Sequence, residues 1–251
     1  MDTTDAIDAM DGIYRERRYR NEVRETGLAT FEVQVRETDL WIRADRDMTA
    51  LARESIIKYR NYLEEYIRIR PEFRDSLQPI GFDPVAPQIV RTMLEESAKA
   101  GVGPMAAVAG AVAQFVGEDI LNGSSSQVIV ENGGDIYLKS GREVRIGVFA
   151  GGSPLSGKIV LKISPEMSPL GICTSSATVG PSLSLGKADA VCVLARSAAL
   201  ADAAATAVGN RIRGRADIDP ALRFGSKISG VTGILVIAGE NMGACGELEL
   251  V

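Results

Sequence analysis

The chain has 251 residues, of which 45% are hydrophobic and 24% are charged, and its formal net charge is −5. This composition predicts one large folded domain or two small ones, and the acidic balance argues against a general nucleic-acid binder, whose affinity comes from neutralised phosphates. The chain has no histidine and three scattered cysteines, which excludes imidazole catalysis and supports neither a zinc site nor a disulfide framework.

The N-terminal part of the chain predicts an extension, a hairpin and a long helix. Residues 1–30 form the extension, which begins with an acidic stretch that lacks the features of a secretion signal and so indicates a cytoplasmic protein. Five arginines between Arg15 and Arg24 are interrupted by glutamates, which is typical of a solvated face or a subunit contact. Residues 29–44 alternate in the manner of a hairpin, and residues 48–69 have the period of an amphipathic helix that ends at Pro71.

Small residues dominate the next helical region. A helix over roughly 85–99 is followed by a glycine stop, and Pro104 begins a second helix that runs to about Asn122. The longest apolar stretch, residues 105–116, is shorter than the ~20 residues that a membrane helix needs, so no membrane segment is expected. Small side chains over nearly all of its surface predict that this helix is central and closely packed.

The rest of the chain mixes strands with one further helix. The expected strands cover residues 127–131, 136–139, 144–149, 158–163, 188–195, 233–237 and 247–250, and the expected helix covers residues 198–210. Because strand blocks and helix pairs do not alternate strictly, we expect an α+β fold in which mostly antiparallel sheets carry helices on one side.

The expected helix at 198–210 carries the first of two chemical motifs. Asp202 and Thr206 lie four positions apart among alanines, so both emerge on one face of the helix. Two oxygen ligands at that spacing suit a hard cation such as Mg²⁺, which fills the rest of its shell with phosphates and water. The alternative is structural: Ser197 caps the helix, Asp202 lies near its positive end and Thr206 packs among the alanines.

The second motif follows an expected strand and is rich in glycine. Its residues are Asn132, Gly133, Gly134 and Asp135. They favour either a plain hairpin turn, or a turn whose glycines let the edge of a nucleotide or flavin approach while Asn132 or Asp135 hydrogen-bonds it.

A hydroxyl-rich loop is expected between these motifs, at Thr174, Ser175, Ser176 and Thr178, and it is closed by Gly180-Pro181. Such a loop either presents backbone N–H groups to a phosphate or is an ordinary surface connection. Cys173, at its entry, is either a small core residue or a partly exposed thiol, whereas Cys192 lies in an apolar strand and is expected in the core.

The order and spacing of the two motifs resemble the ApbE flavin transferase superfamily. The matching segments are Asn132-Gly133-Gly134-Asp135-Ile136 and Ala201-Asp202-Ala203-Ala204-Ala205-Thr206, and the likeness extends over about residues 80 to 210. The run from Ala100 to Gln114, continuing into the first motif, looks closer still to an uncharacterised ApbE-like family of bacteria and archaea.

The resemblance implies a single ApbE-like domain over residues 31–251. It also implies a Mg²⁺ ion held by Asp202, Thr206 and a backbone carbonyl near Ala109. A flavin, FAD or FMN, would lie at the glycine turn and at Thr174, Ser175 and Ser176.

Two departures bear on the reaction. The transferases carry a histidine-containing segment before the Asp/Thr helix, and this chain has no histidine; it also has Gly110 where they carry a lysine. Whether the chain is a Mg²⁺-dependent transferase therefore stays open.

Two functions of different class follow from the resemblance. The first is a Mg²⁺-assisted enzyme or binding protein for a flavin or another phosphate-bearing small molecule, with no nucleic-acid or membrane partner and with homo-oligomerisation left open. The second is a non-catalytic accessory or sulfur-carrier protein in sulfide assimilation and homocysteine biosynthesis, in which Cys173 carries the sulfur.

Overall fold

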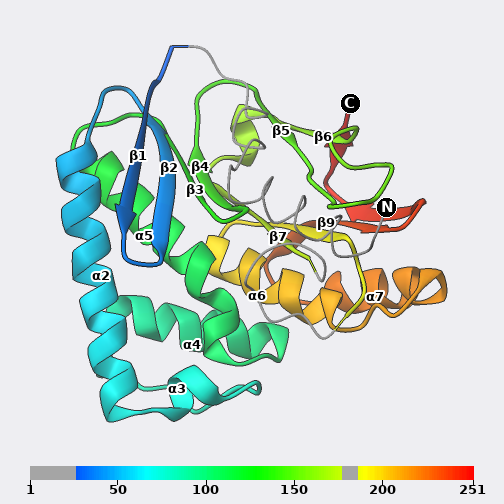
Figure 1. Ribbon diagram of the computed structural model, residues 1–251, viewed down its shortest axis with the longest axis horizontal. Coiled ribbons are helices and arrows are strands. Elements are labelled where there is room, and N and C mark those ends of the chain that lie inside the picture. The colour runs from blue at the N-terminus through cyan, green and yellow to red at the C-terminus, as the bar shows by residue number, and fades with distance from the viewer. Residues whose placement is uncertain (1–26, 177–185) are drawn as a thin grey trace, which may run out of the picture.

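The computed structural model describes residues 27–176 and 186–251 (Figure 1). Most of the expected N-terminal extension, including the arginine cluster from Arg15 to Arg24, lies outside the described residues. The same holds for Thr178 and Gly180-Pro181 of the expected hydroxyl-rich loop. The first strand among the described residues begins at Ala29.

Eight strands form one large sheet in the order β1-β2-β3-β4-β7-β8-β9-β10, and every neighbouring pair is antiparallel. Three more strands, in the order β11-β6-β5, form a small antiparallel sheet. The strands are β1 (Ala29–Val35), β2 (Thr38–Ala44), β3 (Val128–Asn132), β4 (Asp135–Lys139), β5 (Val144–Gly147), β6 (Val160–Ile163), β7 (Leu170–Ser175), β8 (Ala190–Ala195), β9 (Val231–Ala238), β10 (Asn241–Gly246) and β11 (Glu249–Leu250).

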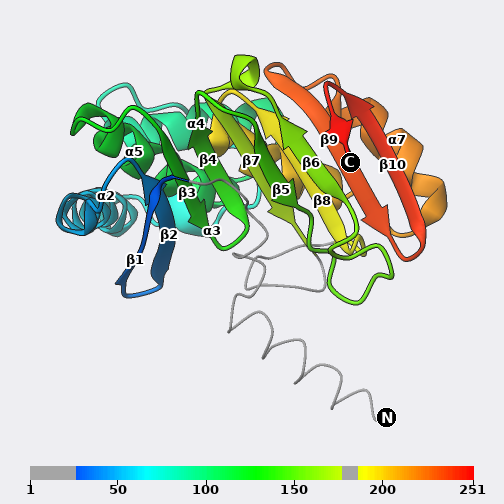
Figure 2. The ribbon, with the colours of Figure 1, turned by 90° about the horizontal axis from the view of Figure 1, so that it is seen from above.

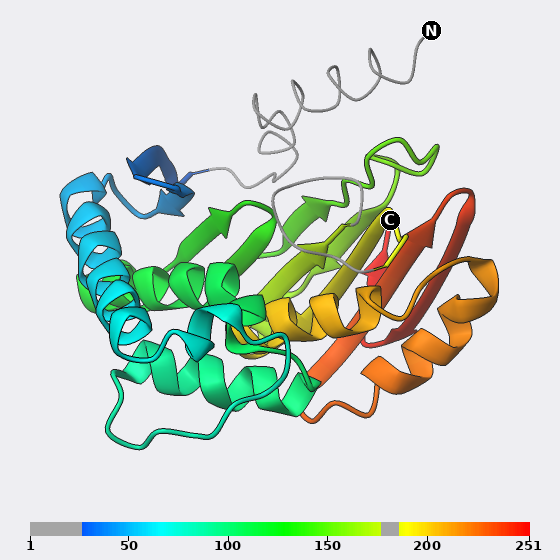
Figure 3. The same cartoon turned by 60° about the horizontal axis from the view of Figure 1, so that its bottom comes forward.

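The helices cover one face of the large sheet and the small sheet covers the other (Figures 2 and 3). They are α2 (Thr49–Ile69), α3 (Glu72–Asp75), α4 (Gln88–Ala100), α5 (Val108–Asn122), α6 (Ala198–Gly209) and α7 (Ile218–Gly225), with short 3₁₀ turns at Pro104–Ala107, Pro165–Met167 and Arg215–Asp217. This arrangement confirms the expected α+β fold of antiparallel sheets with helices on one side. The strands of the small sheet, β5, β6 and β11, were expected, but their place as a separate sheet on the opposite face was not.

Alternation along the strands divides the buried side chains into two cores. In β3, Val128 and Val130 join the core under the helices, whereas Ile129 joins the core between the two sheets. Successive side chains of a strand point to opposite faces, so Asn132 shares the helix face with Val128 and Val130. In β4, Tyr137 belongs to the helix-side core, which places Asp135 on that same face.

Helix α5 lies at the centre of the helical layer. The segment Pro104–Asn122 is long and apolar enough to cross a membrane by length and composition alone. It packs instead against α2, α4, α6, β3 and β4, and over half of its most apolar stretch is buried inside the protein. Its composition is therefore accounted for by its place in the core, as the small side chains predicted.

Apart from 3₁₀ turns, four elements were not expected from the sequence: α3, β7, α7 and β10. Helix α7 carries its buried residues at helical spacing, Ile218, Ala221, Leu222 and Gly225. Pro220 obscures this period, although a proline is tolerated in the first turn of a helix, where the N–H groups have no partner in the helix.

Candidate functional site

The glycine motif forms the tight turn between β3 and β4. Asn132 and Asp135 are register partners at the ends of the two strands, so only Gly133 and Gly134 lie in the loop. Their φ angles are +65° and +102°, which favours glycine at both positions of a two-residue hairpin loop. The Gly134 N–H donates to the carboxylate of buried Glu131 at 2.6 Å. The local geometry is that of a hairpin turn, as one of the two interpretations predicted.

Asp202 reaches from α6 to the beginning of α5. Its Oδ2 atom accepts a hydrogen bond from the Gly110 N–H at 2.9 Å. Because α5 begins at Val108, this N–H is one of those at a helix start that have no partner in their own helix. The beginning of α6 is capped separately, since the Ser197 hydroxyl oxygen accepts the Leu200 N–H at 3.2 Å. The Ser197 cap is confirmed, and the structural role of Asp202 is to cap α5.

The two helices cap each other. Gln114 of α5 places its Oε1 atom 3.0 Å from the Ala198 N–H, at the beginning of α6. A close approach of the two backbones makes this exchange possible, because a Cβ atom at Gly110 would lie 2.2 Å from the Ala198 carbonyl oxygen. A side chain at position 110, such as a lysine, therefore does not fit this packing.

Asn132 connects the turn to the same end of α5. Its Nδ2 group donates to the Ala109 carbonyl oxygen at 3.0 Å. Asp135, which is 7% exposed, is the register partner of Cys173 in β7 and shares its face of the sheet. The turn, the start of α5 and Asp202 are thus brought together, although they come from distant parts of the chain.

Thr206 completes a polar stripe on α6. Every residue of α6 is buried except Asp202 and Thr206, which keep part of their surface accessible. They lie one helical turn apart, so they emerge on the same face, as expected from the spacing. On a helix of buried alanines, these two side chains supply the accessible oxygen atoms.

The carboxyl groups of Asp135 and Asp202 influence each other. Burial raises the pKa of Asp135 well above its ordinary value, and the negative charge of Asp202 raises it further. Burial also raises the pKa of Asp202 to about 7, although the backbone N–H groups of Gly110 and Ala109 oppose this rise by stabilising the charged form. In the described part of the chain, no lysine or arginine forms an ion pair with either group.

These oxygens fit a magnesium ion better than a transition metal. The described residues contain no group of three or more His, Cys, Asp or Glu side chains that could hold a metal. Mg²⁺ needs fewer protein ligands, because it uses one or two carboxylates and completes its shell with water and phosphate. The Ala109 carbonyl lies in the first turn of α5 and accepts the Asn132 Nδ2 group as well as the helix hydrogen bond of that turn.

Comparison with known proteins identifies the family of the chain. The family model described as "AbpE bacteria" matches residues 20–239. The chain is a member of this AbpE family. A similar family protein is a "UPF0280 protein" of Methanocella arvoryzae, which is 42% identical over 219 residues, covering 87% of this chain and 89% of the relative.

Solved structures similar to this AbpE family member are flavin transferases. The apo flavinyl transferase ApbE of Pseudomonas stutzeri superposes with a TM-score of 0.55 at 12% identity, covering 87% of this chain and 94% of that one. The flavin transferase ApbE of Vibrio cholerae gives a TM-score of 0.51 at 11% identity, covering 88% and 97%. At such identities the likeness shows the fold, and the expected ApbE-like fold is thereby confirmed.

The hydroxyl-rich segment of this AbpE family member is not a loop where one was expected. Thr174 and Ser175 belong to strand β7, paired with Cys192 and Val191 of β8. The prediction of a loop is wrong for Thr174 and Ser175, because the backbone of both residues is paired with β8 in the large sheet. Ser176 follows the strand and is itself buried. Thr174 still lies beside the glycine turn, since a Cβ atom on Gly134 would be 3.8 Å from its carbonyl oxygen.

The cysteines of this AbpE family member do not offer a reactive thiol at the site. Cys173 is 0% exposed and its thiol donates to the Ala198 carbonyl oxygen at 3.3 Å. Burial raises the pKa of the Cys173 thiol well above its ordinary value, and the charge of Asp135 raises it further. Of the two interpretations of Cys173, the small core residue is confirmed. Cys192 is also buried, as expected, and Cys245 is partly exposed.

Proposed function

We propose that the chain binds a flavin or another phosphate-bearing small molecule where the glycine turn meets α6, with the help of Mg²⁺. The observation that carries this proposal is the convergence on the start of α5 of the turn and the Asp202 face of α6. The flavin is suggested by the solved structures of similar fold, which are flavin transferases.

Asp202, Thr206 and the Ala109 carbonyl would hold the ion. The raised pKa values of Asp135 and Asp202 support this assignment, because two poorly solvated carboxyl groups beside one another favour a bound cation. When bound, Mg²⁺ would neutralise phosphate oxygens of the ligand. The chain itself positions these groups: Asn132 holds the Ala109 carbonyl, and the N–H groups of α5 hold the Asp202 carboxylate.

The binding surface beside the ion would be built from the turn and the end of β7. Gly133 and Gly134 have no side chains, so the backbone of the turn is open to a flat ligand. Asp135 is an acceptor or, when protonated, a donor for polar atoms of such a ligand. Thr174, Ser175 and Ser176, at the end of β7, would continue this surface.

The proposal includes a cytoplasmic location, because a reducing compartment suits a chain whose cysteines are free.

Flavin transfer is not part of the proposal. Position 110 has no room for a lysine, and the chain has no histidine for the segment that the transferases carry. A sulfur-carrier function would require an accessible thiol, and Cys173 is buried. We therefore propose ligand binding, with the small molecule as the partner.

Isothermal titration calorimetry with FAD and FMN, with and without Mg²⁺, tests the proposal. We expect affinity for at least one flavin to fall about tenfold or more when Mg²⁺ is removed or when Asp202→Asn is introduced, because the charge on which hard-cation binding depends is lost. Asp219→Asn, which removes an exposed carboxylate on α7, is the matched control and should bind like the wild type. If neither flavin binds the folded wild type at millimolar concentration, the proposal fails.

A further inference from the structure

Strand β10 is an edge strand of the large sheet, with β9 as its neighbour on one side (Figure 2). The Glu247 N–H donates to the Thr232 carbonyl oxygen at 2.8 Å and so continues the ladder past the end of β10. Because backbone groups alternate in direction along an antiparallel strand, the odd-numbered residues of β10 point their N–H and C=O groups to β9, as Glu247 does. The even-numbered residues point theirs outward; they are Met242, Ala244 and Gly246.

The outer side of β10 is unprotected. In the described part of the chain, no further backbone partner is present for the outward groups of Met242 and Ala244. Edge strands are usually guarded against pairing by a charged side chain, a proline or a bulge. Strand β10, with the sequence Asn-Met-Gly-Ala-Cys-Gly and a regular register to β9, has none of these. Strand β1, at the other edge of the sheet, carries the exposed Glu32. The open edge for a further strand is therefore that of β10.

Helix α7 lies behind the same edge of the sheet (Figure 2). It packs against both outer strands. The side chains of Ile218 and Leu222 lie against Gly243 of β10, and Gly225 lies against the Ile234 side chain of β9. The axis of α7 is therefore between the two strands, about half a strand spacing inside β10.

Two opposite charges on α7 face the free side of this edge. Asp219 and Arg223 are exposed and lie one helical turn apart. The buried stripe of α7 runs between Phe224, which contacts Arg211 next to α6, and Asp219 on the other flank. That flank consequently faces away from α6. Among the described residues, neither Asp219 nor Arg223 forms an ion pair.

We propose that two copies of the chain associate through β10, with the two strands antiparallel about a two-fold axis at Ala244. Ala244 of each copy donates its N–H to the Ala244 carbonyl oxygen of the other. Met242, which is 44% exposed, lies opposite Gly246 of the second copy, where the absence of a side chain leaves room for it. The two large sheets become one continuous sheet, and two copies complete the assembly because the axis is two-fold.

Helix α7 favours a second copy as the partner of β10. The two α7 helices run antiparallel on one face of the joined sheet, about two strand spacings or roughly 10 Å apart, which is the distance of packed helices. Leu222 contacts both Gly243 and Cys245, one on either side of the axis. The axis thus passes beside the middle of the helix pair, so Asp219 of each copy faces Arg223 of the other. None of these residues belongs to the candidate site, so the inference does not rest on the proposed function.

Sedimentation velocity over about 1–100 µM protein tests the inference. The wild type should sediment as a species of twice the chain mass. Ala244→Pro removes the central outward N–H and no hydrogen bond to β9, so the dissociation constant of the dimer should rise about tenfold or more. Met242→Lys places a charge on the edge and should act in the same direction. Val85→Lys adds the same charge at a side chain that is 90% exposed on a distant loop, and should change the constant less than about twofold.

A charge exchange tests the arrangement of the helices. Arg223→Glu places like charges opposite each other and should weaken the dimer about tenfold. The double variant Arg223→Glu/Asp219→Arg restores opposite charges and should return the dissociation constant to within about threefold of the wild-type value. Arg53→Glu, at an exposed arginine of α2, changes the net charge equally and should leave the dimer intact.

Three results would overturn the inference. The first is a wild-type chain that stays monomeric at about 100 µM. The second is a dimer that both Ala244→Pro and Met242→Lys leave intact, which would indicate association through another surface. The third is a double variant that associates no better than Arg223→Glu. Thermal unfolding shows whether each variant is folded; if Ala244→Pro is not, Met242→Lys with its control Val85→Lys decides.

Discussion

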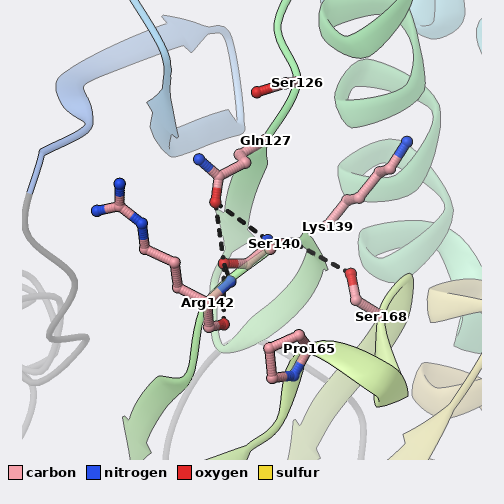
Figure 4. Close-up of a pocket in the computed structure, with 8 residues that line it drawn as sticks. Ser126, Gln127, Lys139, Ser140, Arg142, Pro165 and Ser168 are labelled. Carbon is pink, nitrogen blue, oxygen red and sulfur yellow. Dashed lines mark hydrogen bonds between the residues drawn. The ribbon is translucent and has the colours of Figure 1, made fainter.

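The two ends of the β3–β4 hairpin differ in the chemistry that they present. At the turn end, the side chains around the backbone are acceptors, the carboxyl groups of Glu131, Asp135 and Asp202. At the open end, neutral side chains hold the loop after β4: the Gln127 Oε1 atom accepts the Gly141 N–H and the Ser140 hydroxyl oxygen accepts the Arg142 N–H (Figure 4). Both ends belong to the same two strands with the same ladder of hydrogen bonds. The backbone N–H and C=O groups of the two strands are hydrogen-bonded to each other at both ends. The polar side chains around them therefore decide what each end can bind.

The two ends also differ in their exposure to water. The turn end lies under α5 and α6, where low solvation raises the pKa values of Asp135 and Asp202. The open end is formed by loop residues, and Gly141 and Arg142 are exposed, so that solvent screens its charges. Substitutions at the turn end should therefore have larger effects on stability than substitutions at the open end.

The largest effect should come from the packing that supports the turn end. In Gly110→Ala the new Cβ atom would lie 2.2 Å from the Ala198 carbonyl oxygen and 2.9 Å from the Asp202 Cβ atom, which forces α5 and α6 apart. We expect the free energy of unfolding to fall by about 3 kcal/mol, at the upper end of the usual cost of overpacking. Gly81→Ala, where a Cβ atom meets nothing within 4 Å, is the control and should change it by less than about 0.5 kcal/mol. Urea denaturation measures both, and equal stability of the two variants would contradict the close approach.

The next effect is a pH dependence of stability. Asp202 has a folded pKa of about 7, above its ordinary value of 3.8. Between these values the folded protein holds a proton that the unfolded chain has released, so the free energy of unfolding should fall as pH rises from 4 to 7. Asp202→Asn removes this contribution, so the stability of the variant relative to the wild type should increase over the same range.

Denaturation at several pH values in the absence of Mg²⁺ measures this difference, which should be on the order of 2 kcal/mol. Asp219→Asn again serves as the control, with a pH profile parallel to that of the wild type. A difference between Asp202→Asn and the wild type that stays constant from pH 4 to 7 would show that the Asp202 carboxyl group titrates normally.

Removing the carboxamide of Asn132 at the turn end, or that of Gln127 at the open end, should lower the free energy of unfolding by less. The two variants compare the two ends directly. Asn132→Ala removes the hydrogen bond to the Ala109 carbonyl in a partly buried place and should cost about 1–2 kcal/mol. Gln127→Ala removes the bond from the exposed Gly141 N–H, which water can replace, and should cost less than about 1 kcal/mol. Chemical denaturation under identical conditions gives the order; a larger loss in Gln127→Ala would reverse the comparison of the two ends.

The smallest expected effect is at the thiol beside the turn. Cys173 is buried with a raised pKa, so iodoacetamide at pH 8 should leave it unmodified in the folded protein. The partly exposed Cys245 is the internal comparison and should be modified first. Mass spectrometry of peptides from native and denatured samples locates the label. Rapid labelling of Cys173 in the native sample would mean that the turn end opens readily.

Strong periodicity explains how much of the fold could be predicted. The hairpin at 29–44 and the helix at 48–69 have clear periods of two and 3.6 residues, and both are present with boundaries shifted by at most one residue from β1, β2 and α2. Strand β10 could not be recognised, because it contains Gly243 and Gly246 and, among the described residues, pairs only with β9. Glycine has low strand propensity, and pairing to β9 stabilises β10 all the same.

The candidate site was only partly predictable. The spacing of Asp202 and Thr206 predicts that both lie on one face of α6. The sequence around Asp202 does not indicate that its carboxylate caps α5, which begins much earlier in the chain. The proximity of the two motifs rested on a resemblance. The hydroxyl side chains of Thr174 and Ser175 favour a loop because hydroxyls are frequent in loops, although a central strand accommodates them when their backbone is paired. The pocket at the open end of the hairpin, which is lined by Gln127, Ser140 and Ser168 among others, gave no signal in the sequence, since serine, glutamine and glycine are ordinary turn residues.

The mutual capping of α5 and α6 has a consequence for how the molecule opens. Each helix supplies the acceptor for an N–H group at the start of the other, Asp202 for Gly110 and Gln114 for Ala198. Fraying of one helix would leave the other without a partner, so both should open in a single subglobal step. In native-state hydrogen exchange, the amides of Gly110 and Ala198 should therefore have the same opening free energy and the same dependence on denaturant.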